Sequence, residues 1–132
     1  MTKEAKIISC IVCDITRQEE GGKTTLLGVY PKSVAVTKLP AILPNFGIWV
    51  EVLPAQKKNS NIEFEIVSPD KKTLVKGKGK LEISSTDYPI GLPIQFHHVT
   101  FNVAGKYVIK FAIDGAMKKI GEFTVLKNKL SE

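Results

Sequence analysis

The stretch that decides the fold is residues 101–125, FNVAGKYVIKFAIDGAMKKIGEFTV. Its apolar residues recur at every second position, a period that indicates strands rather than helices. One side of its first strand carries Tyr107, Ile109, Phe111 and Ile113. Asp114-Gly115 follows, and this pair is a strong signal for a two-residue turn. The stretch therefore predicts an antiparallel hairpin with one face in a core, to which Phe123 and Val125 of the second strand contribute.

Tyr107 stands two residues after Gly105, at the start of the penultimate expected strand. This arrangement resembles the tyrosine corner of immunoglobulin-like sandwiches, in which the phenol hydrogen-bonds to backbone a few residues upstream. We therefore predict a structural role for Tyr107 and not a catalytic one.

The same two-residue period recurs along most of the chain. The expected strands before the closing hairpin are 5–17, 23–30, 33–37, 46–53, 61–67, 73–84 and 94–103. Residues 39–45 contain two prolines and are expected to carry the chain from one sheet to another. The strand 94–103 changes phase at His97-His98, which a β-bulge or a bend would reconcile. Eight or nine short strands predict an all-β fold, an antiparallel immunoglobulin-like β-sandwich.

The chain has 132 residues, which predicts one domain, 1–132, around a single core. Apolar residues make up 43% and charged residues 24%, a composition typical of globular proteins. No apolar run approaches the ~20 residues that cross a bilayer, and the first residues have no pattern of a secretion signal. We therefore expect a cytoplasmic protein that does not bind membranes.

The Gly-Lys-Thr sequence at 22–24 raises the question of a phosphate-binding loop. That motif needs a glycine five positions before Gly22, where Arg17 stands, and it must open a helix. The residues that follow favour a strand instead. Gly21-Gly22 can both adopt positive φ, so we predict a type I′ turn with Glu20 opposite Lys23.

The two cysteines, Cys10 and Cys13, have a spacing found in redox and zinc sites. On a strand, however, their side chains point to opposite faces and their Cα atoms lie about 10 Å apart, beyond the reach of a disulfide. His97 and His98 are adjacent and would also point oppositely. We therefore predict buried free thiols and no catalytic, cofactor or metal site, so that the protein is not an enzyme.

Two stretches carry a resemblance that spans nearly the whole chain. They are CDITRQEEGGKTTLLGVYP at 13–31 and PIQFHHVTFNVAGKYVIKFAIDG at 93–115, followed by EFTV at 122–125. Together they resemble a family of uncharacterised bacterial domains. In that family the expected elements are Cys-Asp, a Gly-Gly-Lys hairpin, a Gly-Val-Tyr return strand and a late Phe-to-Tyr element. The resemblance implies the fold and no activity.

Lys76, Lys78 and Lys80 form a row on one face of the expected strand 73–84. Side chains two residues apart on a strand stand about 7 Å from each other, a spacing close to that of phosphates along a single nucleic-acid strand. Stacking aromatics usually accompany such contacts, and none lies between these lysines. Lysines also keep sheet edges from pairing. Anion contact and a solvated edge therefore both stay open, in a chain of net charge +6.

Strands such as 7–12 and 46–53 are apolar on more than one side. With no assembled catalytic set, this favours a non-catalytic module that binds another protein or assembles with itself through a sheet face or edge. The alternative is sequence-independent nucleic-acid or anion binding by the lysine row. The sequence identifies no small-molecule substrate.

Overall fold

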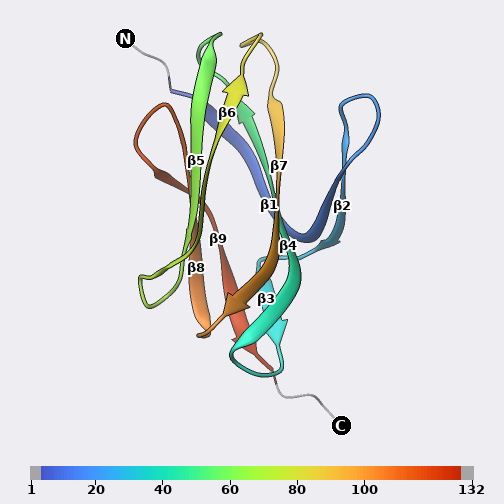
Figure 1. Ribbon diagram of the computed structural model, residues 1–132, viewed down its shortest axis with the longest axis vertical. Coiled ribbons are helices and arrows are strands. Elements are labelled where there is room, and N and C mark those ends of the chain that lie inside the picture. Colours follow the sequence, from blue (N-terminus) through green and yellow to red (C-terminus); the bar gives the residue numbers. More distant parts are fainter. Residues whose placement is uncertain (1–3, 129–132) are drawn as a thin grey trace.

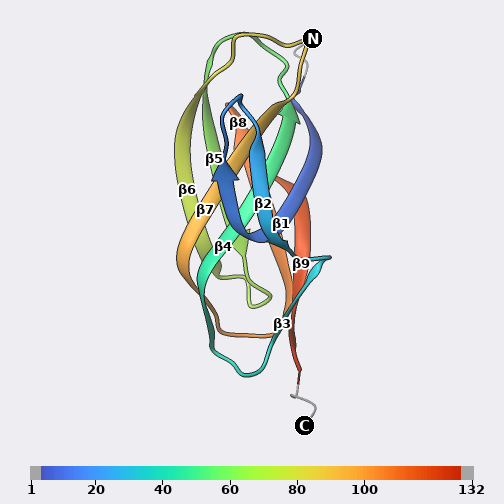
Figure 2. The same cartoon turned by 90° about the vertical axis from the view of Figure 1, so that its right-hand side faces the viewer.

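The structure is a computed structural model that describes residues 4–128, and these fold into nine strands in two sheets (Figures 1 and 2). The first sheet has the order β2-β1-β4-β7, with bounds Thr24–Val29, Lys6–Gln18, Ala41–Leu53 and Ile90–Phe101. The second has the order β3-β9-β8-β5-β6, with bounds Ser33–Val36, Lys118–Lys127, Gly105–Ile113, Asn59–Val67 and Thr73–Glu82. The predicted all-β sandwich is confirmed. Its immunoglobulin-like topology stays a prediction.

One strand pair departs from the predicted antiparallel arrangement. β3 runs parallel to β9, with Ser33 beside Thr124 and Val36 beside Lys127, so the second sheet is mixed. Side-chain alternation over four residues shows that a strand is half-buried, but it does not encode the direction of its neighbour. The sequence could not distinguish the two directions.

Four aromatic rings join the two sheets at the centre of the core. They are Phe46 of β4, Phe101 of β7, Tyr107 of β8 and Phe123 of β9. The ring centroids of Phe46 and Phe101 lie 5.5 Å apart, and those of Tyr107 and Phe123 lie 5.4 Å apart. Such rings contribute much of the buried area that stabilises a small core. The Tyr107 hydroxyl donates to the Val103 carbonyl at 2.7 Å, which is the backbone contact predicted for a tyrosine corner.

β4 begins earlier than predicted, within the segment 39–45 that we expected to cross between the sheets. It starts at Ala41 and includes Pro44. A proline cannot donate a ladder hydrogen bond, but β1 pairs with β4 only over Gly47–Leu53. Pro44 therefore has a strand on one side alone, which is why a strand at the middle of the sheet tolerates it.

The predicted phase change in β7 is present and has a simpler cause than a bulge. The ladder keeps one register on both sides, with Leu43 beside Val99 and Asn45 beside His97. His98 between these pairs takes a φ of 58°. A residue in the left-handed region rotates the strand about its own axis. The inward side chains therefore fall at even positions before His98 and at odd positions after it, and no residue is inserted.

Two predicted turns are longer in the structure. The Glu19 amide donates to the Lys23 carbonyl at 2.8 Å, so the first loop has three residues between them and Glu19, not Glu20, is opposite Lys23. Gly21-Gly22 do take positive φ, as predicted. Asp114-Gly115 open a four-residue connection between Ile113 and Lys118 instead of forming a two-residue turn.

Two glycines lie beneath large aromatic rings on neighbouring strands. Trp49 is half-buried on the outer face of the first sheet, where it covers Gly91. On the core face of the second sheet, Phe64 covers Gly77, and a Cβ atom there would lie 2.1 Å from the ring. Each ring occupies the space that a side chain would fill.

We expect Gly77→Ala to destabilise the fold by about 1–3 kcal/mol, because the Phe64 ring must leave its position in a packed core. Gly79→Ala is the matched control on the same face of β6, since a Cβ there meets Ile62 at an ordinary 3.4 Å. Urea unfolding of both variants measures the difference. Equal stability of the two would contradict this account of Gly77.

Candidate functional site

β1 turns away from the sandwich after Cys13 and forms a projecting hairpin with β2. Its first half, Lys6–Cys13, pairs with β4, and its second half, Cys13–Gln18, pairs with β2. Figures 1 and 2 show residues 14–29 standing off the outer face of the first sheet, with a free tip at the Gly-Gly turn. We call residues 14–29 the arm.

The arm is tied to the sandwich by hydrogen bonds at its base. The Tyr30 hydroxyl donates to Asp14 Oδ1 at 2.5 Å. Gln95 of β7 donates from Nε2 to the Asp14 carbonyl at 2.9 Å, and its Oε1 accepts from the Thr16 amide at 2.7 Å. Tyr30 packs in turn against the core ring of Phe46, with centroids 6.3 Å apart. These contacts fix the direction in which the arm leaves the sheet.

Small residues at the base make room for this network. Gly28 has a φ of 68°, and a Cβ there would lie 2.5 Å from Asp14 Oδ2. On β4, a Cβ at Gly47 would lie 3.0 Å from Thr16 and 3.1 Å from the Cys13 sulfur. The Cys-Asp and Gly-Val-Tyr motifs of the sequence thus meet in space. Gln95 was missed by the sequence reasoning, because its position opposite Asp14 depends on how β1 and β7 are arranged.

Burial, and next the hydrogen bond and negative charge of Asp14, raise the pKa of Tyr30 above its ordinary value. A tyrosine phenol is protonated at neutral pH, and this upward shift extends the range in which Tyr30 remains a donor to the carboxylate. A charged acceptor makes such a hydrogen bond stronger than one between neutral groups. These hydrogen bonds consequently hold the base of the arm in one orientation; we call them the polar joint.

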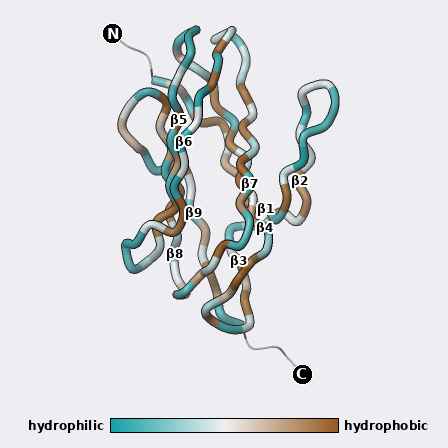
Figure 3. The backbone as a smooth tube through the Cα atoms, viewed as in Figure 1, coloured by the Kyte–Doolittle hydropathy of each residue, from teal (hydrophilic) through white to brown (hydrophobic). Residues whose placement is uncertain are grey.

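One face of the arm is apolar and open to solvent. Ile15 is 37% exposed, Leu27 opposite it is 47% exposed and Val29 is 55% exposed. The other face is less exposed and includes Thr16, whose side chain lies against Gly47. Figure 3 shows hydrophobic residues along the lower part of the arm and hydrophilic residues at its tip. The arm thus holds apolar side chains away from the core.

A groove of about 800 Å³ adjoins the base of the arm, between β1 of the first sheet and β9 of the second. Its apolar lining includes Ile7, Ile8, Cys10, Ile109 and Ile120, and Val29 of the arm also borders it. Ile8 is 46% exposed at this side. The apolar surface of the arm is therefore continuous with the uncovered side of the sandwich.

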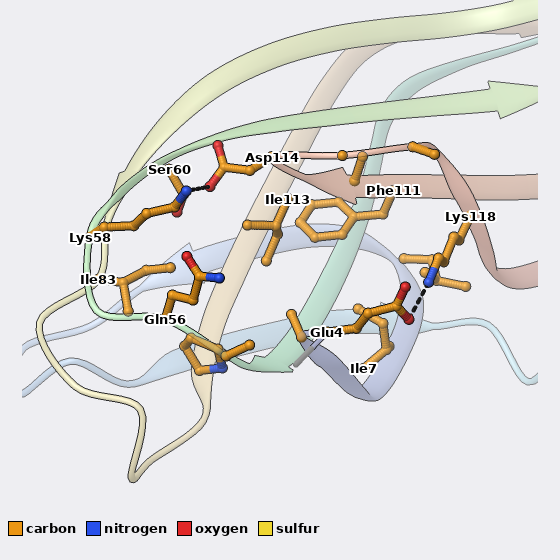
Figure 4. A pocket seen from close by; sticks show the side chains of 17 residues that line it. Glu4, Ile7, Gln56, Lys58, Ser60, Ile83, Phe111, Ile113, Asp114 and Lys118 are labelled. Atoms are coloured by element: carbon orange, nitrogen blue, oxygen red, sulfur yellow. Dashed lines mark hydrogen bonds and ion pairs between the residues drawn. The ribbon is translucent and has the colours of Figure 1, made fainter. Parts of the chain in front are cut away.

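A second cavity, of about 440 Å³, lies at one end of the sandwich (Figure 4). Its rim carries two ion pairs, Lys58 with Asp114 at 3.4 Å and Lys118 with Glu4. Hydrogen bonds from the Asn61 amide and from Ser60, and then the charge of Lys58, lower the pKa of Asp114. These four side chains form two pairs of opposite charge. One pair links the residue before β5 to the residue after β8, and the other links the start of β9 to the segment before β1.

The histidines and cysteines are not brought together. Neither of the two cavities is lined by His97 or His98, and the His97 ring lies 3.1 Å from the Asn45 side-chain oxygen. Both thiols are free; Cys13 is buried and Cys10 half-buried. Burial raises the pKa of Cys10 to about 11. Over residues 4–128, no cluster of three or more Cys, His, Asp or Glu is placed to hold a metal ion.

The predicted lysine row lies on β6, at the edge of the second sheet. Lys76, Lys78 and Lys80 are all exposed, as predicted. Acidic residues of β5 lie beside them, with Glu65 opposite Lys76 and Glu63 opposite Lys78. Lys78 Nζ is 3.6 Å from Glu63 Oε1. The row is therefore part of a mixed-charge face.

Comparison with known proteins places the chain in a family without an assigned role. Residues 8–126 match the model of a family of unknown function, DUF6941, and the chain belongs to this family. No curated protein matches it. No helix long and apolar enough to span a membrane occurs among residues 4–128.

A solved structure that the chain resembles is that of Pseudomonas fluorescens alkylpurine DNA glycosylase AlkC bound to DNA containing an abasic site analog. The TM-score is 0.51 at 11% sequence identity, covering 93% of this chain and 30% of the glycosylase. The chain thus spans less than a third of that protein. A likeness at this identity shows the fold alone.

We expect Tyr30→Phe to destabilise the protein by about 1–3 kcal/mol, because Asp14 loses its charged hydrogen bond. Amide exchange in the arm should become faster, since the joint to the core is lost. Tyr88→Phe is the matched control, because Tyr88 is 73% exposed. Urea unfolding and hydrogen exchange measure the two effects, and an unchanged arm in Tyr30→Phe would contradict the role of this contact.

Proposed function

We propose that the protein is a non-catalytic interaction module and that the arm is its binding element. The observation that carries this proposal is the exposed row formed by Ile15 and Leu27, with the exposed Val29 at the base, on a hairpin held at a fixed angle. Apolar surface that is contiguous and exposed commonly marks a protein interaction site. The groove beside β1 extends that surface.

The polar joint supports the same proposal. A two-stranded hairpin alone is marginally stable in water, and an arm without a joint would lose conformational entropy on binding. Asp14, Tyr30 and Gln95 restrain the arm before any partner arrives. Such preorganisation lowers the cost of association. The arm is thus suited to binding as it stands.

We expect Leu27→Lys to abolish binding of a protein partner, because a charge is placed in the apolar row of the arm. Ile42→Lys is the matched control, since Ile42 is an exposed isoleucine on β4, outside the arm, at 67% exposure. The immobilised protein and both variants are compared for capture of proteins from an extract of the host cells. Capture of the same proteins by Leu27→Lys would overturn the proposal.

The alternative function, sequence-independent nucleic-acid or anion binding, has the exposed row of Lys76, Lys78 and Lys80 as its support. The neighbouring Glu63 and Glu65 reduce the positive potential that phosphates would meet. The alternative is therefore the weaker proposal.

If nucleic acid does bind there, its affinity should fall steeply with salt, and replacing all three lysines by Glu should abolish it. Fluorescence anisotropy with a labelled single-stranded oligonucleotide measures both effects. Replacement of Lys106, Lys110 and Lys119 by Glu, three lysines elsewhere on the second sheet, is the control for net charge. Equal loss in both triple variants would show that net charge and not the row is responsible.

A further inference from the structure

We propose that the partner of the arm is a second copy of this chain, joined by antiparallel pairing of β2 with β2 of the other copy. This inference rests on the proposed function of the arm and names its partner. It would convert two projecting hairpins into one four-stranded sheet with the order β1-β2-β2-β1.

β2 offers an open row of backbone groups. It lies at the end of the first sheet, with β1 on one side and no strand on the other among residues 4–128. The Glu19 amide bonds to the Lys23 carbonyl, so these two residues form a hydrogen-bonded pair of the ladder. In an antiparallel ladder such pairs alternate with pairs whose backbone groups point away from the partner strand. The N–H and C=O groups of Thr24 and Leu26 therefore point away from β1. Thr24–Leu27 is in regular register, and Gly28 with its positive φ ends the regular part.

The other sheet ends carry features that oppose strand pairing, whereas β2 is regular from Thr24 to Leu27. β6 presents its lysine row, β7 contains Pro93 and the left-handed His98, and β3 is four residues long. Lysine, proline, local twist and short length are the usual protections of a sheet edge. β2, with the sequence TTLLGV, has no charged residue and no proline. Thr24–Leu27 is thus free of charge and proline along its open edge.

The edge is complementary to itself. A strand paired with its own copy about a two-fold axis is antiparallel, and every contact occurs twice. Centred on the outward backbone groups of Leu26, the pairing sets Leu26 opposite Leu26 and Leu27 opposite Thr25 of the second copy, so the Ile15–Leu27 rows of both arms lie on the same face. Ile15 and Leu27 of both copies, which are partly exposed in each separate arm, then share one face of the four-stranded sheet. No like charges meet, because β2 carries none.

The charges at the two ends of the arm fit the same arrangement. Antiparallel pairing brings the tip of each arm beside the base of the other. Glu20 is exposed at the tip and Lys32 is exposed just after the base. Neither is in an ion pair within the described part of the chain. Each tip therefore presents Glu20 to Lys32 of the second copy, with the exposed Lys23 also at the tip.

The test is the mass of the purified chain in solution over a series of concentrations. Sedimentation or light scattering should show the 14.5 kDa monomer doubling in mass as concentration rises. Leu27→Lys places a charge on the shared apolar face on each side of the axis and should weaken the dimer by about a hundredfold. Ile42→Lys should dimerise as the unchanged chain does. Circular dichroism and urea unfolding establish that each variant is folded.

A charge exchange then tests the antiparallel arrangement. Glu20→Lys and Lys32→Glu should each weaken the dimer, and the double variant should restore it. A dimer that Leu27→Lys leaves intact, or one without restoration in the double variant, would overturn pairing through β2.

A chain that stays monomeric at every concentration would overturn the second copy as partner. The capture experiment with host extract then decides the proposed function separately. If Leu27→Lys loses a captured protein there, the arm binds a different partner and only the self-pairing is wrong. If capture is also unchanged, both proposals are wrong.

Discussion

The hydrogen bond between Tyr30 and Asp14 is the contact on which the distinctive part of this structure depends. Tyr30 packs against Phe46 of the core, and Asp14 lies where β1 leaves the sheet. The bond thus links the arm to the most rigid part of the molecule. A tyrosine phenol is protonated at neutral pH, and burial and the nearby carboxylate extend the range in which it remains a donor. Without this link, only the Gln95 hydrogen bonds and the backbone would hold the hairpin to the sandwich.

The same joint connects packing with function. The hydrogen bonds of Asp14 and Gln95 satisfy polar groups at the base, and they do so without covering Ile15 or Leu27. Hydrogen bonds have defined directions, whereas apolar contact has none. A polar joint can therefore hold apolar side chains in water.

Much of the fold was predictable because alternation along a strand is a local property. Phe46, Ile48, Val50 and Val52 are inward as predicted, and so is Tyr107 with its bond to Val103. The positive φ of Gly21-Gly22 was also predicted correctly. The errors lie where a partner strand decides the outcome. Pro44 is accepted in a strand because β1 is absent on one side of it, and a sequence does not show which strands are neighbours.

The sequence by itself determined that side chains alternate between a core and solvent, that the cysteines stay apart, and that Lys76, Lys78 and Lys80 share one exposed face. These follow from the two-residue period of a strand, which needs no knowledge of distant residues. Only the tertiary structure decided that the first hairpin projects, that Gln95 meets Asp14, and that Glu63 lies beside Lys78. Those contacts join residues 15 to 81 positions apart, and long-range pairing follows from the strand order of the whole chain.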